Sequence, residues 1–264
     1  MMATDWSRLE QAVKANEAHG SIGVSAISPC GERWEVQGKT RFPAASTVKI
    51  PIMIEIYRGI DRGELAIDDT YIVRSADKAP GSGVLQHMHA GLQLSLGDLL
   101  YLMMSISDNT ATNILIDMAG MDRINATMQD LGMAASTLGR PMRGRLAIEG
   151  EEENWATPND YTAVVKALID EQAASPAACQ AMLTTLTLQQ NHRRIGRYVP
   201  ASKSYRWGSK TGSNTGITND VGFVQSPAGT MIIALYSQGI GDAVTSEIAL
   251  SDIAEAAMQA TGII

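Results

Sequence analysis

The 264-residue sequence predicts an α+β fold in which an antiparallel sheet, built from both ends of the chain, carries an inserted all-helical lobe. Strand-like runs concentrate near the two ends, and stretches with helical spacing fill the middle. The length is large for one simple domain and small for two ordinary ones. We therefore expect an α/β lobe from residues 1–60 and 202–264, a helical lobe from residues 61–201, and a functional site in the cleft between them.

The N-terminal elements are a helix and a hairpin. Residues 5–18 place apolar side chains on one helical stripe. Two strand-like runs, 21–28 and 32–38, flank a Pro-Cys-Gly turn and predict a hairpin. The next segment, 46–58, is expected to be helical, with an irregularity at Pro51.

The later elements follow the same reasoning. Helical spacing marks the stretches 96–106, 109–120 and 158–172, whose methionines we expect to fill the core. Strand-like runs and a closing helix then occupy 204–212, 220–227, 230–238 and 244–260.

Composition excludes several classes of function. A net charge of −7 without a basic stripe argues against nucleic-acid and anionic-membrane partners. No run approaches the length of a membrane span, and no signal-peptide pattern is visible at the start. Cys30 and Cys179 lie far apart and are expected to be free thiols. His87 and His89 lack a third ligand at metal-site spacing, so we expect no metal.

A serine stands three residues before a lysine in FPAASTVKIP, residues 42–51. In a helix, Ser46 and Lys49 share one face and lie side by side. Apolar surroundings lower the pKa of the amine, and a neutral Lys49 then accepts the proton of the Ser46 hydroxyl. The pair alone is a weak signal, because Ser-x-x-Lys is expected about once by chance in such a chain. An N-cap serine followed by a surface lysine is the alternative interpretation.

Two further motifs strengthen the catalytic interpretation. SDN at 107–109 ends one helical stretch and opens the next, and KTG at 210–212 lies on the strand after the helical region. Taken singly, SDN is typical of a helix cap and KTG of a solvated edge strand. Each motif occurs by chance in about 5% of such chains. The combination of three motifs in this order is not explained by either structural role.

The sequence resembles the serine β-lactamase and penicillin-binding protein superfamily, in particular the serine hydrolases related to class A β-lactamases. Besides the three motifs, the resemblance covers FPAASTVKIPIM, LQLSLGDLLYLMMSISDNTATNILI, NWATPND and GSKTGSNTGITNDVGFV. It implies the β-lactamase/transpeptidase-like fold, a three-layer α/β/α sandwich with a helical lobe. It also implies acyl transfer from amides or esters to water without a cofactor, on β-lactams or D-Ala-type peptides and esters. Such proteins are usually exported, and we expect a monomer; the sequence leaves the compartment open.

The resemblance also implies residue roles. Ser46 attacks the acyl carbon, Lys49 accepts its proton, and Ser107 passes a proton to the leaving nitrogen. Lys210 supplies positive potential near Ser107. The substrate is expected to contact Asn109, Thr211, Gly212 and Ser213, and the backbone N–H groups of Ser46 and Ser213 form the oxyanion hole.

The sequence departs from the class A pattern in two places. Class A enzymes carry Glu-x-x-x-Asn, whose glutamate activates the deacylating water, before the T-x-P segment. Here that loop holds four glutamates without the asparagine spacing, namely Glu149, Glu151, Glu152 and Glu153. Either one of them is the deacylation base, or the loop is a solvated acidic surface.

The second departure concerns the strand after KTG. Class A enzymes often place a carboxylate-binding arginine there, whereas this chain has Asn219 and Asp220. The sequence does not choose among Arg193, Arg194 and Arg206 as replacements.

Three alternatives remain at this point. A D-alanyl peptidase or esterase uses the same nucleophile with a different leaving group, and a slow-turnover penicillin-binding protein is acylated without fast release. A metal-dependent lactamase is the third, and it would lose activity with a chelator.

Overall fold

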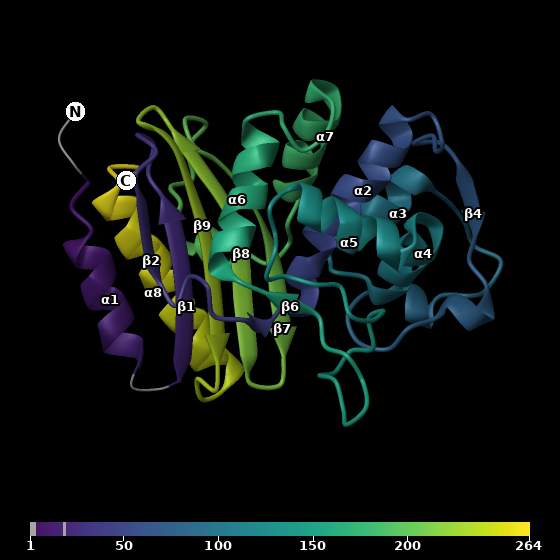
Figure 1. The fold of residues 1–264 in the computed structure, drawn as a ribbon, viewed down its shortest axis with the longest axis horizontal. Helices are drawn as coiled ribbons and strands as arrows, with labels where there is room; N and C mark the ends of the chain where they lie inside the picture. The colour runs from purple at the N-terminus through teal and green to yellow at the C-terminus, as the bar shows by residue number, and fades with distance from the viewer. Residues whose placement is uncertain (1–3, 18–19) are drawn as a thin grey trace.

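The computed structural model describes residues 4–17 and 20–264, and its centre is a five-stranded antiparallel sheet with strand order β2-β1-β9-β8-β7 (Figure 1). The strands are β1 (Ser21–Ile27), β2 (Arg33–Val36), β7 (Arg206–Asn214), β8 (Ile217–Ser226) and β9 (Gly229–Gln238). Because β1 pairs with β9 and β9 with β8, the two chain ends form one sheet, as the sequence predicts.

Helices cover both faces of this sheet. On one face lie α1 (Ser7–Glu17) and α8 (Ala243–Ala260), which share an apolar core with residues such as Val24 and Leu235 of the sheet. Helix α6 (Pro158–Ile169) packs on the other face against β1, β8 and β9. Side chains of β1, β8 and β9 are therefore buried on both faces, which confirms the three-layer α/β/α architecture.

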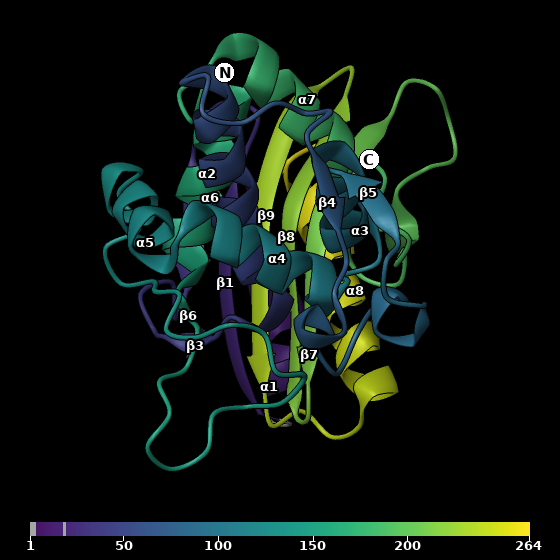
Figure 2. The same cartoon turned by 90° about the vertical axis from the view of Figure 1, so that its right-hand side faces the viewer.

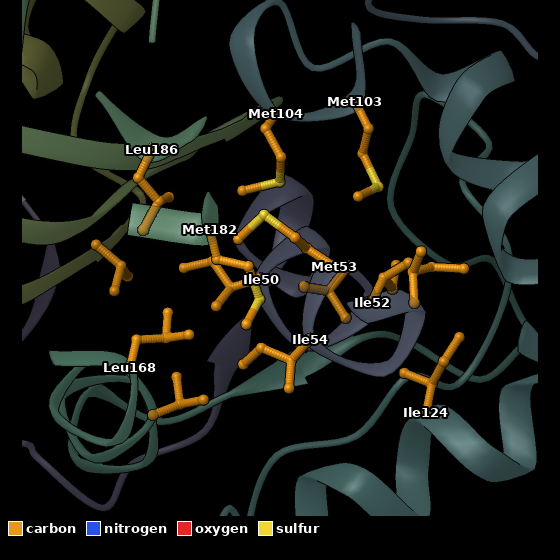
Figure 3. Packing of buried hydrophobic residues seen from close by; sticks show 14 of the residues in the cluster. Ile50, Ile52, Met53, Ile54, Met103, Met104, Ile124, Leu168, Met182 and Leu186 are labelled. Carbon is orange, nitrogen blue, oxygen red and sulfur yellow. The ribbon is translucent and has the colours of Figure 1, made fainter. Parts of the chain in front are cut away.

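The remaining helices form a lobe beside the sheet, which Figure 2 shows in front of the strands. They are α2 (Lys49–Asp61), α3 (Leu96–Ser105), α4 (Asn109–Ala119), α5 (Met121–Asp130) and α7 (Pro176–Leu186). Helix α2 runs through the core of this lobe, and its Ile50, Met53 and Ile54 pack among the side chains of the surrounding helices (Figure 3). Met103 and Met104 are fully buried there, as expected of core methionines.

Two expectations need correction. Residues 61–201 are not all helical, since β4 (Thr70–Ile72) pairs with β5 (Gln93–Ser95), and β6 (Trp155–Ala156) pairs with β3 (Phe42–Pro43). Strands this short contain too few residues to show alternation. Ser46 does not start a regular α-helix but lies in a 3₁₀ turn, η1 (Ala45–Val48), ahead of α2. The lobe boundaries at residues 60 and 202 stay a prediction.

Shorter features complete the chain. The other 3₁₀ turns are η2 (Ser75–Asp77), η3 (Leu85–His87) and η4 (Ile195–Tyr198). Cys30 is exposed and Cys179 is buried, and both are free, as expected. Among the helices of the described residues, none is long and apolar enough to cross a membrane.

Candidate active site

Four of the predicted site residues line one cavity of about 440 Å³ between β7 and the helical lobe. These are Ser46, Ser107, Thr211 and Ser213. The cavity is also lined by Ser82, Ser105, Ile106, Gln189, Gln190, Asn191, His192 and Arg193. The structure therefore brings the three motifs, which are widely separated in sequence, to one place.

Ser46 lines this cavity with 7% of its surface exposed. The residue before it, Ala45, has a φ of 46°, a left-handed conformation that is costly for a side chain with a Cβ atom. Strand β7 approaches this turn closely. A Cβ atom on Gly212 would come within 3.0 Å of the Ala44 carbonyl oxygen and 3.2 Å of the Ser46 nitrogen. Gly212 therefore permits the approach of the KTG strand to the serine.

Lys49 is fully buried one turn after Ser46. Its Nζ lies 2.8 Å from the Ser107 carbonyl oxygen, 3.0 Å from Ser107 Oγ and 2.9 Å from Asn109 Oδ1. Burial, reinforced by the charge of Lys210, holds the pKa of the Lys49 amine well below its usual range, against an opposing effect of Asp108. A neutral amine can accept a proton. None of these three contacts is to Ser46, so Lys49 is bonded to the SDN turn instead.

The SDN turn is held rigidly by Asp108. Its buried carboxylate caps α4 by accepting from Ala111 N at 3.0 Å, and it accepts from Val84 N at 2.7 Å and Leu85 N at 2.9 Å. Ser107 has a φ of 62°, a strained conformation in a non-glycine residue. The capped helix and the clamped loop thus fix the position of the Ser107 hydroxyl beside Lys49.

Lys210 lies on β7, fully buried, with its Nζ 2.9 Å from the Thr211 carbonyl oxygen. Burial lowers the pKa of Lys210 to about 7, opposed by the carboxylate of Asp220 and assisted by the charge of Arg194. Asp220 pairs with Thr211 across β7 and β8, and burial raises the pKa of its carboxyl group. The site therefore holds two buried lysines whose pKa values are both lowered.

The three arginines that are candidates for the missing carboxylate-binding arginine differ in burial and position. Arg194 is buried, and its guanidinium donates to the Gly212 carbonyl at 2.9 Å and to Ser213 Oγ at 2.6 Å. Glu247 of α8 pairs with it at 3.1 Å. Arg193 is exposed at the cavity wall, and Arg206 is exposed near Thr184, outside the cavity-lining set.

A second, smaller cavity of about 70 Å³ adjoins Ser46 and contains one of the four loop glutamates, Glu153. Its carboxylate pairs with Arg140 at 3.1 Å and accepts from Ala147 N and Asn154 N at 2.7 and 2.8 Å. Three donor groups thus occupy the Glu153 carboxylate, and Arg140 Nη2 contacts both of its oxygens.

The other three glutamates lie outside both cavities. Glu151 is bound by Arg143 and Arg145, and the Arg145 hydrogen bond lowers the pKa of Glu151 to about 2. Glu149 and Glu152 are exposed, which is the solvated surface that the sequence left open.

Sequence reasoning missed Ser82, which lines both cavities and whose carbonyl oxygen accepts from Asn109 N at 3.0 Å. Its setting between two glycines, Gly81 and Gly83, was the available signal. It also did not assign Gln189, Gln190, Asn191 and His192 to the site, although the adjacent Arg193 was a candidate.

Comparison with known proteins identifies the family. The model of a family described as the β-lactamase enzyme family matches residues 6–261. A crystal structure of a β-lactamase from Sphaerobacter thermophilus superposes with a TM-score of 0.97, covers 99% of both chains and is 54% identical.

Two more distant proteins are also similar to this chain, one in sequence and one in fold. β-Lactamase BRO-1 from Moraxella catarrhalis is 26% identical over 79% of this chain and 67% of its own length. The structure of PBP-A, at 23% identity, TM-score 0.87 and 97% and 96% coverage of the two chains, shows a shared fold. The chain therefore belongs to the β-lactamase enzyme family and is a serine β-lactamase-like hydrolase.

Proposed function

We propose that Ser46 attacks the carbonyl carbon of a β-lactam and forms an acyl-enzyme. The observation that carries this proposal is the buried Lys49 amine, whose pKa is lowered by burial and which contacts Ser107 Oγ at 3.0 Å in the wall of the Ser46 cavity. A neutral amine one turn from a serine is a built-in general base, and no histidine is required.

In the acylation step, Ser46 Oγ bonds to the lactam carbonyl carbon and its proton passes to Lys49. The Lys49–Ser46 contact has to form on substrate binding, as catalytic hydrogen bonds often tighten in the complex. The backbone N–H groups of Ser46 and Ser213 stabilise the oxyanion, at about 3 kcal/mol each. The C–N bond then breaks, and the proton travels from Lys49 through Ser107 Oγ to the leaving nitrogen.

The KTG strand recognises the substrate carboxylate. Protonated Lys210 supplies positive potential and Thr211 Oγ1 donates a hydrogen bond, while Asn109 holds Lys49 and contacts the acyl amide. Arg194 orients Ser213 through its 2.6 Å contact with the hydroxyl. This arrangement replaces the strand-borne arginine of class A enzymes.

Deacylation is the slow step in this proposal. The four loop glutamates are either exposed or bound by arginines, and the one at the cavity, Glu153, already accepts hydrogen bonds from three donor groups. A carboxylate whose oxygens already accept from other donors has little capacity left to accept a hydrogen bond from water. This observation favours the second candidate, a slow-turnover penicillin-binding protein, over a fast β-lactamase.

Labelling with a fluorescent penicillin tests the nucleophile. The wild-type protein should be labelled and Ser46→Ala should not, with both showing the same thermal unfolding. Labelling of the alanine variant at another residue would refute the role of Ser46.

Turnover of a chromogenic cephalosporin then distinguishes the candidates. A burst of one equivalent followed by slow release is expected, whereas sustained fast turnover contradicts slow deacylation. Absence of a burst with cleavage of a D-Ala-D-Ala peptide or ester would instead support the peptidase or esterase.

A further inference from the structure

The two cavities both adjoin Ser46 but are otherwise lined largely by different residues. They share Ser46, Ser82 and Ser213, but Ser107 and Thr211 line only the larger one. In the proposed acylation, Ser107 delivers the proton to the leaving nitrogen, and Thr211 binds the carboxylate on the leaving side. The smaller cavity, which contains Asn109 but neither of these residues, therefore faces the acyl side of the scissile bond.

The acyl-side cavity is lined by three arginines, Arg140, Arg143 and Arg145. Two carboxylates form ion pairs with these arginines. Glu153 pairs with Arg140, and Glu151 pairs with both Arg143 and Arg145. One guanidinium charge is left in excess around the cavity.

The placement of the acidic side chains supports an anionic ligand. The remaining acidic side chains of the loop, Glu149 and Glu152, are exposed and line neither cavity, so water screens them. Arg143 and Arg145 are also partly exposed but line the cavity, whereas Glu149 and Glu152 do not line it.

The same cavity also has an apolar part, formed by Met142 and Leu146. Met142 is 9% exposed, and Asn113 holds its backbone through contacts of 2.8 and 3.0 Å. An acyl substituent that contacts both the arginines and this apolar part of the cavity would carry an apolar group beside a negative charge.

We propose that this cavity selects substrates whose acyl side chain carries a carboxylate next to an apolar group, with Arg143 and Arg145 as the specificity-determining residues. The inference rests on the proposed acylation of Ser46 and adds the acyl-side preference to it. The half-exposed guanidiniums of Arg143 and Arg145 share one carboxylate, so either can turn toward a substrate anion without leaving Glu151 unpaired.

Benzylpenicillin and carbenicillin form a matched pair for the test, because they differ by one carboxylate on the acyl side chain. The measured quantity is the ratio of the acylation kcat/KM for carbenicillin to that for benzylpenicillin. Arg143→Gln and Arg145→Gln should each lower this ratio, and the double variant should lower it about fivefold, the effect of one partly exposed ion pair. Arg143→Lys, which keeps the charge, should retain most of the wild-type ratio.

Two controls separate specificity from general damage. Arg8→Gln, in an exposed arginine on α1, should leave the ratio at the wild-type value. Raising the ionic strength should lower the ratio for the wild-type protein and change it little for the double variant.

The outcomes distinguish this inference from the proposed function. If both penicillins acylate Ser46 but the ratio is the same in the wild-type protein and the double variant, the acyl-side preference is wrong and the role of Ser46 as nucleophile is retained. If neither penicillin acylates the wild-type protein, both the role of Ser46 and the acyl-side preference are wrong.

Discussion

The charge of Lys210 should set the basic limb of the pH profile of acylation. Lys210 has a pKa of about 7, and only its ammonium form attracts the substrate carboxylate. Its protonated fraction falls from about nine-tenths at pH 6 to about one-tenth at pH 8, so kcat/KM for a carboxylated β-lactam should fall about tenfold over that range. Lys49 acts in the opposite sense, because protonation at lower pH removes the base.

Replacing Asp220, the buried carboxylate that raises the pKa of Lys210, tests whether Lys210 sets the basic limb. The carboxylate of Asp220 raises the pKa of Lys210 against burial and the charge of Arg194. Asp220→Asn keeps the shape, removes the charge and should move the basic limb to lower pH by about one unit, since a close opposite charge shifts a pKa by about 1–3 units. Asp117→Asn, on an exposed aspartate of α4, is the matched control and should leave the profile unchanged.

The assay is the pH dependence of the acylation rate from pH 5 to 9 with one penicillin, measured by stopped-flow for the wild-type protein and both variants. A basic limb that stays in place in Asp220→Asn, while the protein remains folded by circular dichroism, would refute the assignment of that limb to Lys210.

Three further predictions concern the base, the strand and the loop. Lys49→Met should slow acylation by at least about 100-fold without loss of thermal stability, because an apolar side chain replaces a buried amine; unchanged acylation would contradict its role as base. Gly212→Val should slow acylation about 100-fold, since the new Cβ meets backbone of the Ser46 turn at 3.0 to 3.2 Å; a rate near that of the wild type would show that the close approach is dispensable. Glu153→Gln should lower the free energy of unfolding by about 3 kcal/mol in chemical denaturation, because it breaks a pair whose side chains are 8% and 12% exposed. It should leave the lifetime of the acyl-enzyme unchanged by intact mass; a trapped adduct would instead identify Glu153 as the deacylation base.

The parts of the site that sequence could predict depend on local spacing. Ser46 and Lys49 lie one turn apart, and the SDN segment joins two helices, so their neighbourhoods follow from helix periodicity and capping. The strand that contains Lys210 is nine residues long, which is long enough to recognise as a strand although its burial does not alternate. The fold class likewise follows from long periodic elements at known positions along the chain.

The remaining features depend on contacts between distant residues. Glu153 differs from Glu149 because Arg140 and two backbone N–H groups hold it at the cavity, and nothing in the run of glutamates distinguishes them. Arg194 differs from Arg193 by its burial against β7, where it donates to the Gly212 carbonyl, and the sequence of the two adjacent arginines does not show this difference. Lys49 bonds to Ser107 Oγ, because the SDN turn, in which Ser107 has a left-handed backbone, brings this hydroxyl beside the amine.

Time-resolved intact mass spectrometry after mixing with benzylpenicillin tests most directly whether the hydroxyl at position 46 is activated by an uncharged amine. The wild-type protein should gain one penicilloyl group that persists over many seconds, Lys49→Met should gain it far more slowly, and Ser46→Ala should gain none. A wild-type protein that never shows the adduct, or a Lys49→Met variant that acquires it at the wild-type rate, would contradict the mechanism.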